Sequence, residues 1–154
     1  MERTLIIIKP DAINRAIVSE IMHRFERKGL KIVGMKMARL TEAQLHEHYV
    51  HLKGKPFFPS LVEFMRETPT VLMVLEGIGV IEICRNLCGA THGAKALPGT
   101  IRGDYSVSTQ SNVVHASESQ KIAEEEIKRF FGKNELFEYE RIDSELLYSE
   151  DEMK

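Results

Sequence analysis

The chain has 154 residues, enough for one domain with a sizeable core, and its 43% hydrophobic and 29% charged residues are ordinary for a globular protein. A net charge of -2 gives no global reason to expect nucleic acid or a membrane surface as a partner, so an anion site must come from locally clustered lysines and arginines. The N-terminal apolar run is too short for a signal peptide, which predicts a soluble, cytoplasmic protein.

The apolar pattern predicts four strands and five helices. Continuous β-branched runs and strict alternation are typical of strands, whereas apolar residues three or four apart are typical of helices. Strands are expected over 4–8, 30–40, 70–75 and 113–115, and helices over 13–28, 41–49, 61–65, 78–87 and 119–131. Strands and helices mixed in this order predict a sheet with helices packed on it, in an α/β or α+β sandwich.

Two of these elements have a specific register. The helix over 13–28 is expected to be continuous, because apolar residues recur every four positions from Ile17 through Ile21 to Phe25. In the following strand, alternation places three apolar side chains on the face opposite Lys36, namely Val33, Met35 and Met37.

Two segments lack such periodicity. Residues 88–104 read as a long glycine-rich loop that carries Arg102, and a loop of this length in a compact domain is usually functional or disordered. Residues 138–154 hold seven Asp or Glu and are expected to form an acidic tail, either solvated or laid on a neighbouring subunit. The predicted division is therefore a domain over 1–137 and a tail over 138–154.

The only two cysteines, Cys84 and Cys88, are four residues apart in a predicted helix. This spacing on one helix rarely gives disulfide geometry, so both are expected to be reduced. Two cysteines without a nearby Cys or His pair also make a poor zinc site.

The stretch from Asn112 to Ser119 ends a short apolar run on His115. Ser117 and Gln120 have the spacing of a capping box, which predicts a helix N-terminus directly after the histidine. Free N–H groups and the positive end of a helix dipole favour phosphate there, and a histidine in that place can be a phosphoryl acceptor. From local sequence alone, an ordinary loop histidine before a helix remains an alternative.

The last predicted helix carries a carboxylate on its apolar face. At 100° per residue, Glu126 falls inside the buried stripe, whereas Glu125, Lys128 and Arg129 fall outside it. An inward carboxylate needs a partner, and Glu126 could hold one ring nitrogen of His115 and leave the other free. The alternative is a glutamate at the edge of the stripe that reaches solvent. The stripe itself consists of Ile122, Ala123, Ile127, Phe130 and Phe131.

Three basic residues are candidates for binding phosphate. Lys9 ends the first strand and is held by the following proline, while Arg85 and Arg102 can make planar, bidentate phosphate contacts. Glycines on both sides of Arg102 allow a ligand to approach the backbone closely. Each of the three, taken singly, also fits an ordinary surface charge.

Taken together, these stretches closely resemble the nucleoside diphosphate kinase family from about Arg3 to Phe131. The order and the gaps of the motifs make the resemblance specific, although each motif alone is only modestly so. The matching stretches are Ile8-Lys9-Pro10-Asp11, His48-Tyr49 followed by Pro56-Phe57-Phe58, Gly89-Ala90-Thr91, Pro98-Gly99-Thr100-Ile101-Arg102-Gly103-Asp104 and Asn112-Val113-Val114-His115-Ala116-Ser117.

The resemblance implies a ferredoxin-like α+β sandwich with a four-stranded antiparallel sheet. It implies transfer of the γ-phosphate of a nucleoside triphosphate to a nucleoside diphosphate, by a ping-pong route through a phosphohistidine. Mg²⁺ would be carried by the nucleotide phosphates, with no metal ligand from the protein. The family forms hexamers and tetramers, so a homo-oligomer is expected, with the hexamer favoured and no nucleic acid required.

The resemblance also assigns roles residue by residue. His115 matches the family's nucleophile, and Lys9, Ser117 and Glu126 match residues that support catalysis. Phe57 matches the aromatic residue that stacks on the base. The remaining nucleotide contacts match Lys9, Tyr49, Arg85, Thr91, Arg102 and Asn112.

Departures from the family pattern occur at Ala116, at Glu118 and at His92-Gly93, where many members have Gly, Asp and Asn-Pro. Two other functions remain to be weighed. A nucleotide-binding regulatory or scaffold member of the fold would be expected to lack one of Lys9, Arg102, Asn112 or His115, all of which are present. A phosphorelay carrier would need no base-stacking phenylalanine.

Overall fold

The computed structural model describes residues 1–152. Four strands form one antiparallel sheet in the order β2-β3-β1-β4. The predicted ferredoxin-like α+β architecture is thereby confirmed, and β1 is a central strand paired on both sides. The strands are β1 (Glu2–Ile8), β2 (Lys31–Ala38), β3 (Thr70–Gly77) and β4 (Val114–Ala116).

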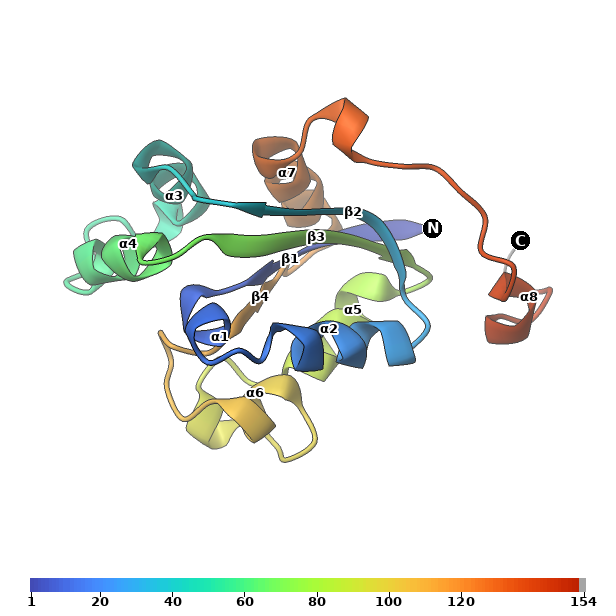
Figure 1. The fold of residues 1–154 in the computed structure, drawn as a ribbon, viewed down its shortest axis with the longest axis horizontal. Helices are drawn as coiled ribbons and strands as arrows, with labels where there is room; N and C mark the ends of the chain where they lie inside the picture. Colours follow the sequence, from blue (N-terminus) through green and yellow to red (C-terminus); the bar gives the residue numbers. More distant parts are fainter. Residues whose placement is uncertain (153–154) are drawn as a thin grey trace.

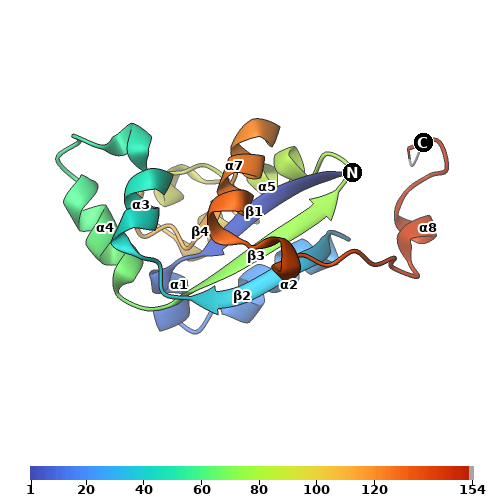
Figure 2. The same cartoon turned by 90° about the horizontal axis from the view of Figure 1, so that it is seen from above.

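Helices cover both faces of this sheet, as Figures 1 and 2 show. Alternate residues of β1 enter two separate cores: Ile6 and Ile8 face α2 and α5, whereas Leu5 and Ile7 face α3, α4 and α7. Burial on both faces explains why β1 reads as a continuous apolar run. The helices are α1 (Pro10–Asn14), α2 (Val18–Arg27), α3 (Glu42–His48), α4 (Phe58–Arg66), α5 (Val80–Cys88), α6 (Ile101–Tyr105), α7 (Gln120–Phe130) and α8 (Ser144–Leu147), with short 3₁₀ turns η1 (Val50–Leu52), η2 (Gly93–Lys95) and η3 (Lys133–Glu135).

The continuous helix predicted over 13–28 is wrong, because the segment forms two helices. Pro10 begins α1, where its missing N–H and fixed φ are favourable. Ala16 then adopts a left-handed φ of 55°, and the N–H of Ile17 bonds back to the carbonyl of Ala12 at 3.1 Å. This geometry closes the end of a helix, and it is usually supplied by glycine, so the sequence carries no signal for it.

In β2, the predicted placement of Met35 and Met37 opposite Lys36 is confirmed, whereas that of Val33 is wrong. A bulge places Val33 as an extra residue between Ile32 and Gly34, which breaks the alternation. Val33 is buried on the same face as Lys36, whose Nζ lies 4.7 Å from the ring of Phe131. Met35 and Met37 lie on the opposite face and are 54% and 60% exposed.

The segment over 88–104 is only partly the predicted loop, because it contains η2 and α6. Thr100 caps α6 by accepting a hydrogen bond from the N–H of Gly103 at 3.1 Å. Gly103 itself cannot carry a side chain, since a Cβ there would lie 1.9 Å from the carbonyl oxygen of Leu97. Arg102 is therefore held on a short, tightly packed helix.

The described part of the tail contacts its own chain, an arrangement that the sequence did not suggest. The hydroxyl of Tyr139 donates to the carbonyl of Ile32 at 2.7 Å. Directly before the tail, the N–H of Phe137 donates to the carbonyl of Val33 at 2.8 Å. Arg141 reaches the carbonyl of Gly29 at 3.0 Å, and α8 follows beyond the edge of the sheet (Figure 2). We propose that the domain ends at residue 137 and that the acidic tail begins at residue 138.

Cys84 and Cys88 are both free and buried in α5, as predicted. Within residues 1–152, no helix combines the length and the apolar character that a bilayer crossing needs.

Candidate nucleotide-binding and phosphoryl-transfer site

A cavity of about 900 Å³ opens between α3, α4, α5, β4 and α7. The structure brings nine of the ten predicted site residues to its walls, and Ser117 lies completely buried behind it. Residues far apart in the sequence therefore share one site. The nine are Lys9, Tyr49, Phe57, Arg85, Thr91, Arg102, Asn112, His115 and Glu126.

A strained turn leads into the strand that carries the histidine. Val113 has a φ of 63°, and the N–H of Val114 bonds to the carbonyl of Asn112 at 2.8 Å, which closes a γ-turn. A β-branched residue in this conformation costs on the order of 1–3 kcal/mol and persists only where its surroundings fix it. Here the carboxylate of Asp11 accepts from the Val113 N–H at 3.1 Å, and Lys9 donates its backbone N–H to the Val113 carbonyl at 2.9 Å.

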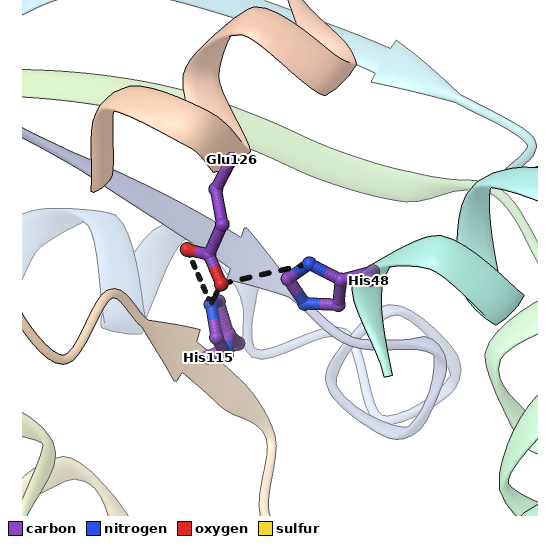
Figure 3. A group of neighbouring side chains, drawn as sticks. All are labelled: His48, His115 and Glu126. Atoms are coloured by element: carbon purple, nitrogen blue, oxygen red, sulfur yellow. Dashed lines mark hydrogen bonds and ion pairs between the residues drawn. The ribbon is translucent and has the colours of Figure 1, made fainter. Parts of the chain in front are cut away.

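His115 lies in β4, opposite Ile7 in the sheet register, and so shares the face that α7 covers. Its Nε2 lies 3.1 and 3.0 Å from the two carboxylate oxygens of Glu126 (Figure 3). An ionised carboxylate only accepts, so we assign the proton to Nε2. The Nδ1 atom then carries the lone pair.

The predicted capping role of Ser117 is wrong. Ser119 caps α7, accepting from the N–H of Ile122 at 3.4 Å. Ser117 instead accepts from the N–H of Leu5 at 3.1 Å and donates to Glu126 Oε2 at 2.6 Å. Its hydroxyl is fully used inside the core, so His115 is positioned by the sheet rather than by a helix N-terminus.

The inward orientation predicted for Glu126 is confirmed, since the residue is 5% exposed. Burial opposes ionisation of its carboxyl group, but the hydrogen bond and charge of His115, together with His48 and Ser117, outweigh burial and hold its pKa below the usual value.

Two other predictions on α7 are corrected: Ile122 is 36% exposed, and the side chain of Arg129 is only 13% exposed. Arg129 donates from Nη1 to His48 Nδ1 at 3.4 Å and forms an ion pair with Glu47 at 2.9 Å.

His48, which we had not assigned, also contacts Glu126. Its Nδ1 lies 3.5 Å from Glu126 Oε1, and its ring centroid lies 4.7 Å from that of His115 (Figure 3). A signal existed in the sequence: His48 follows Leu45 by three residues and therefore lies on the buried face of its helix.

The three side chains could in principle hold a metal, because their ligand atoms lie within 4.8 Å of one another. Two histidines and a glutamate are a common zinc donor set. However, both oxygens of Glu126 already accept hydrogen bonds from Ser117 or His115, and the cationic Arg129 lies 3.4 Å from His48 Nδ1. We therefore interpret the cluster as a hydrogen-bond network.

Lys9 and Asn112 form the buried floor of the cavity. The Lys9 Nζ donates to Asn112 Oδ1 at 2.6 Å, and the Asn112 amide donates to the carbonyl of Thr91 at 2.8 Å. Burial, together with the charge of Arg102, lowers the pKa of Lys9 to about 8. A phosphate placed here would supply the counter-charge that the buried ammonium lacks.

Arg102 is mainly tied to backbone carbonyls. Its guanidinium donates to Val114 at 2.7 Å, to Gly89 at 2.8 Å and to Asn112 at 3.4 Å. A guanidinium has five N–H groups, so two remain for a ligand. Arg85 is exposed on α5 and faces the same cavity.

The opposite end of the cavity is aromatic and open. Phe57 is 48% exposed, whereas Tyr49 is buried, and burial raises the pKa of its hydroxyl group. The Tyr49 hydroxyl has no hydrogen-bond partner among the described residues. A flat exposed ring can stack on a base without selecting among bases.

Comparisons with known proteins agree with this geometry. A family model described as "Nucleoside diphosphate kinase" matches residues 2–136. A nucleoside diphosphate kinase from Parabacteroides distasonis is 50% identical over 152 residues, covering 99% of both chains, and one from Pyrococcus abyssi is 51% identical over 143 residues, covering 91% of this chain and 90% of the relative. A halophilic nucleoside diphosphate kinase from Halobacterium salinarum, solved in complex with CDP, superposes with a TM-score of 0.93 at 42% identity, covering 96% of this chain and 98% of that chain. This chain therefore belongs to the nucleoside diphosphate kinase family.

Proposed function

We propose that His115 is the residue through which this enzyme passes the γ-phosphoryl group from a nucleoside triphosphate to a nucleoside diphosphate. The observation that supports the proposal is the hydrogen bond from Nε2 of His115 to Glu126. This bond leaves Nδ1 free to react with a nucleotide bound in the cavity that His115 lines. In the first half-reaction, Nδ1 attacks the γ-phosphorus, the bond from that phosphorus to the β-phosphate oxygen breaks, and the diphosphate leaves.

The second half-reaction reverses these changes with a different nucleotide. A terminal oxygen of the incoming diphosphate attacks the phosphorus, the bond from phosphorus to Nδ1 breaks, and the new triphosphate leaves. In both directions the proton stays on Nε2 of the imidazole, hydrogen-bonded to Glu126. The two steps therefore need no separate acid or base.

Lys9, Arg85 and Arg102 are proposed to bind the phosphates during both steps. Phosphoryl transfer depends mainly on positioning and charge stabilisation, which these cationic groups supply. Thr91 and Asn112 are proposed to add hydrogen bonds, Tyr49 to bring its hydroxyl group to the sugar-phosphate region, and Phe57 to stack on the base. This division fits the buried polar floor and the open aromatic end of the cavity.

We also propose Mg²⁺ as the cofactor, bound to the nucleotide phosphates rather than to protein side chains. The fit rests on the donor set: the described side chains at this end include Lys9, Arg85 and Arg102, which bind phosphate and not metal. When bound, Mg²⁺ would neutralise phosphate charge that the three cations leave uncompensated.

The partners proposed are nucleoside di- and triphosphates and further copies of this chain, with a hexamer favoured over a tetramer. The exposed Met35 and Met37 on the edge strand β2 support self-association, since apolar side chains beside unpaired strand edges favour pairing with another chain. Sedimentation of the full chain would decide the assembly, and a monomer at micromolar concentration would contradict the proposal.

The enzymatic proposal is tested by labelling with [γ-³²P]ATP. The protein is expected to take up an acid-labile label, to pass it on when a diphosphate is added, and to lose both abilities in His115→Ala. A His115→Ala variant with full exchange activity would contradict the proposal. A scaffold member of the fold would take up no label, and a phosphorelay carrier would show no nucleotide affinity that Phe57→Ala could reduce.

A further inference from the structure

The segment between α6 and β4 contains a buried serine that the proposed mechanism does not use. Ser106 directly follows α6 and is 8% exposed. Its hydroxyl donates to the carbonyl of Ser111 at 2.9 Å and accepts from the N–H of Ser108 at 3.2 Å. Serine hydroxyls commonly brace turns through such bonds to nearby backbone groups. One side chain therefore joins two points of the turn formed by residues 106–111.

The same turn is tied to the segment that precedes α6. The N–H of Gly93, at the start of η2, donates to the carbonyl of Ser108 at 2.9 Å. A Cβ on Gly93 would lie 2.4 Å from the Oγ of Ser106, so only a glycine permits this close approach. A proline at position 93 would also lack the N–H that the hydrogen bond needs. The turn is therefore held both by its own hydroxyl groups and by η2.

The end of this turn faces the buried ammonium group of the cavity floor. Asn112 Oδ1 accepts a hydrogen bond from Lys9 Nζ at 2.6 Å, and the carbonyl of Gln110 accepts from the same Nζ at 3.4 Å. Asn112 is tied in turn to the segment before α6, because its amide donates to the carbonyl of Thr91 at 2.8 Å. Both acceptors thus belong to the end of the turn that Ser106 braces.

We propose that Ser106 is a positioning residue for phosphate binding, whose buried hydroxyl holds the turn in the shape that presents these two acceptors to the ammonium of Lys9. A lysine side chain has many rotamers, so its ammonium stays at one point only while its partners stay in place. Without the hydroxyl, an N–H and a carbonyl of the turn lose their partner, and the turn rearranges to satisfy them. The inference rests on the proposed role of Lys9 in binding phosphate.

A double-mutant cycle separates this role from a contribution to stability alone. ADP affinity is measured by calorimetry in the wild type, in Ser106→Ala, in Lys9→Met and in the double variant. We expect Ser106→Ala to weaken ADP binding by about 3–10-fold when Lys9 is present, within the coupling found between members of one hydrogen-bond network. In the Lys9→Met background the same change should have less than about a twofold effect, because the group through which it acts is gone.

Equal losses in the two backgrounds would mean that the hydroxyl only stabilises the fold, and would overturn the proposal. Thr70→Val is the matched control, since Thr70 is fully buried, lies outside the cavity lining and also donates its hydroxyl to a backbone carbonyl, that of Ala38 at 3.3 Å. This variant should keep the wild-type affinity. A loss equal to that of Ser106→Ala would likewise overturn the proposal.

A milder variant tests the same turn even where Ser106→Ala does not fold. Ser108→Ala removes only the Oγ that accepts from the N–H of Ser111 at 3.2 Å. It should weaken ADP binding by about two- to threefold, the lower end of what one hydrogen bond contributes. An unchanged affinity would contradict the proposal.

The Lys9→Met variant distinguishes failure of this inference from failure of the proposed function. If Lys9→Met binds ADP as tightly as the wild type, the role of Lys9 in phosphate binding is wrong, and the role of Ser106 falls with it. If Lys9→Met binds weakly and the effect of Ser106→Ala is the same in both backgrounds, only the role of Ser106 is wrong.

Discussion

At one end of the cavity the polar side chains are buried and held by several hydrogen bonds, whereas the aromatic side chain at the other end is half exposed. Lys9, Asn112 and Glu126 are each less than 10% exposed, while Phe57 is 48% exposed. The first end is built on the sheet and α7, and the second on the start of α4. The rigid end can hold reacting atoms in place, and the open end can accept different bases.

This contrast predicts different kinetic effects at the two ends. Changes at the buried end should lower the rate of transfer or the stability of the fold, because those side chains are also part of the core. Changes at the open end should alter nucleotide affinity and leave the transfer rate at saturation unchanged.

Glu126→Gln should slow phosphorylation of His115 by about 10–100-fold, by analogy with the carboxylates that orient metal-binding histidines. The amide keeps the shape of the side chain but can turn a donor toward Nε2, which would favour the wrong tautomer of His115. Rapid-quench labelling gives the rate, and calorimetry should show unchanged nucleotide affinity. Glu124→Gln is the matched control on the exposed side of α7, at a residue outside the cavity lining. Equal rates for the two variants would place Glu126 outside the mechanism.

Arg102→Ala should lower the free energy of unfolding by about 1–3 kcal/mol as well as weaken nucleotide binding, because backbone carbonyls lose their donor. Arg85→Ala should weaken binding with little change in stability, since Arg85 is exposed. Urea denaturation followed by circular dichroism compares the two. Equal stability of both variants would show that Arg102 is not part of the scaffold.

Phe57→Ala should weaken nucleotide binding by about 1 kcal/mol, the lower limit for stacking a base on an aromatic ring. The effect should appear in KM and not in kcat at saturation, and it should be similar for purine and pyrimidine nucleotides. Leu97→Ala, at a residue that is 74% exposed and lies outside the cavity lining, is the control. A loss confined to kcat would mean that the open end also positions the reacting phosphate.

Nucleotide affinity should fall about twofold between pH 7 and pH 8, because Lys9 loses its proton around its lowered pKa of about 8. Loss of folding does not explain this fall, since a lysine whose pKa is lower in the folded state than in the unfolded state makes stability rise with pH between those two values. Calorimetric titrations across this range measure the effect. Lys9→Met should lack this pH dependence, and a wild-type affinity that stays constant up to pH 9 would contradict the role of Lys9.

Periodicity predicted the features that depend on one element alone. The phase of the last helix placed Glu126 inside the core, and continuous apolar runs placed the central strands, because burial determines which side chains such elements can carry. The motifs supplied the remaining site residues, and the cavity brings them together.

The features that were missed depend on contacts between elements or on unusual backbone conformations. Ala16 and Val113 adopt positive φ although neither is glycine, and the bulge places Val33 on the opposite face of β2 from Met35 and Met37. The true partner of Ser117 is a carboxylate on α7, which a local capping pattern does not reveal. These features follow from how separate elements pack, so one segment of sequence could not predict them.

We propose that Nδ1 of His115 carries the phosphoryl group. It is tested most directly by locating that group in protein treated with ATP and Mg²⁺, using phosphorus and nitrogen-15 NMR at alkaline pH together with mass spectrometry. We expect one phosphoryl group on Nδ1 of His115, with the proton on Nε2. A phosphoryl group on Nε2, or on another residue such as Ser117, would contradict it.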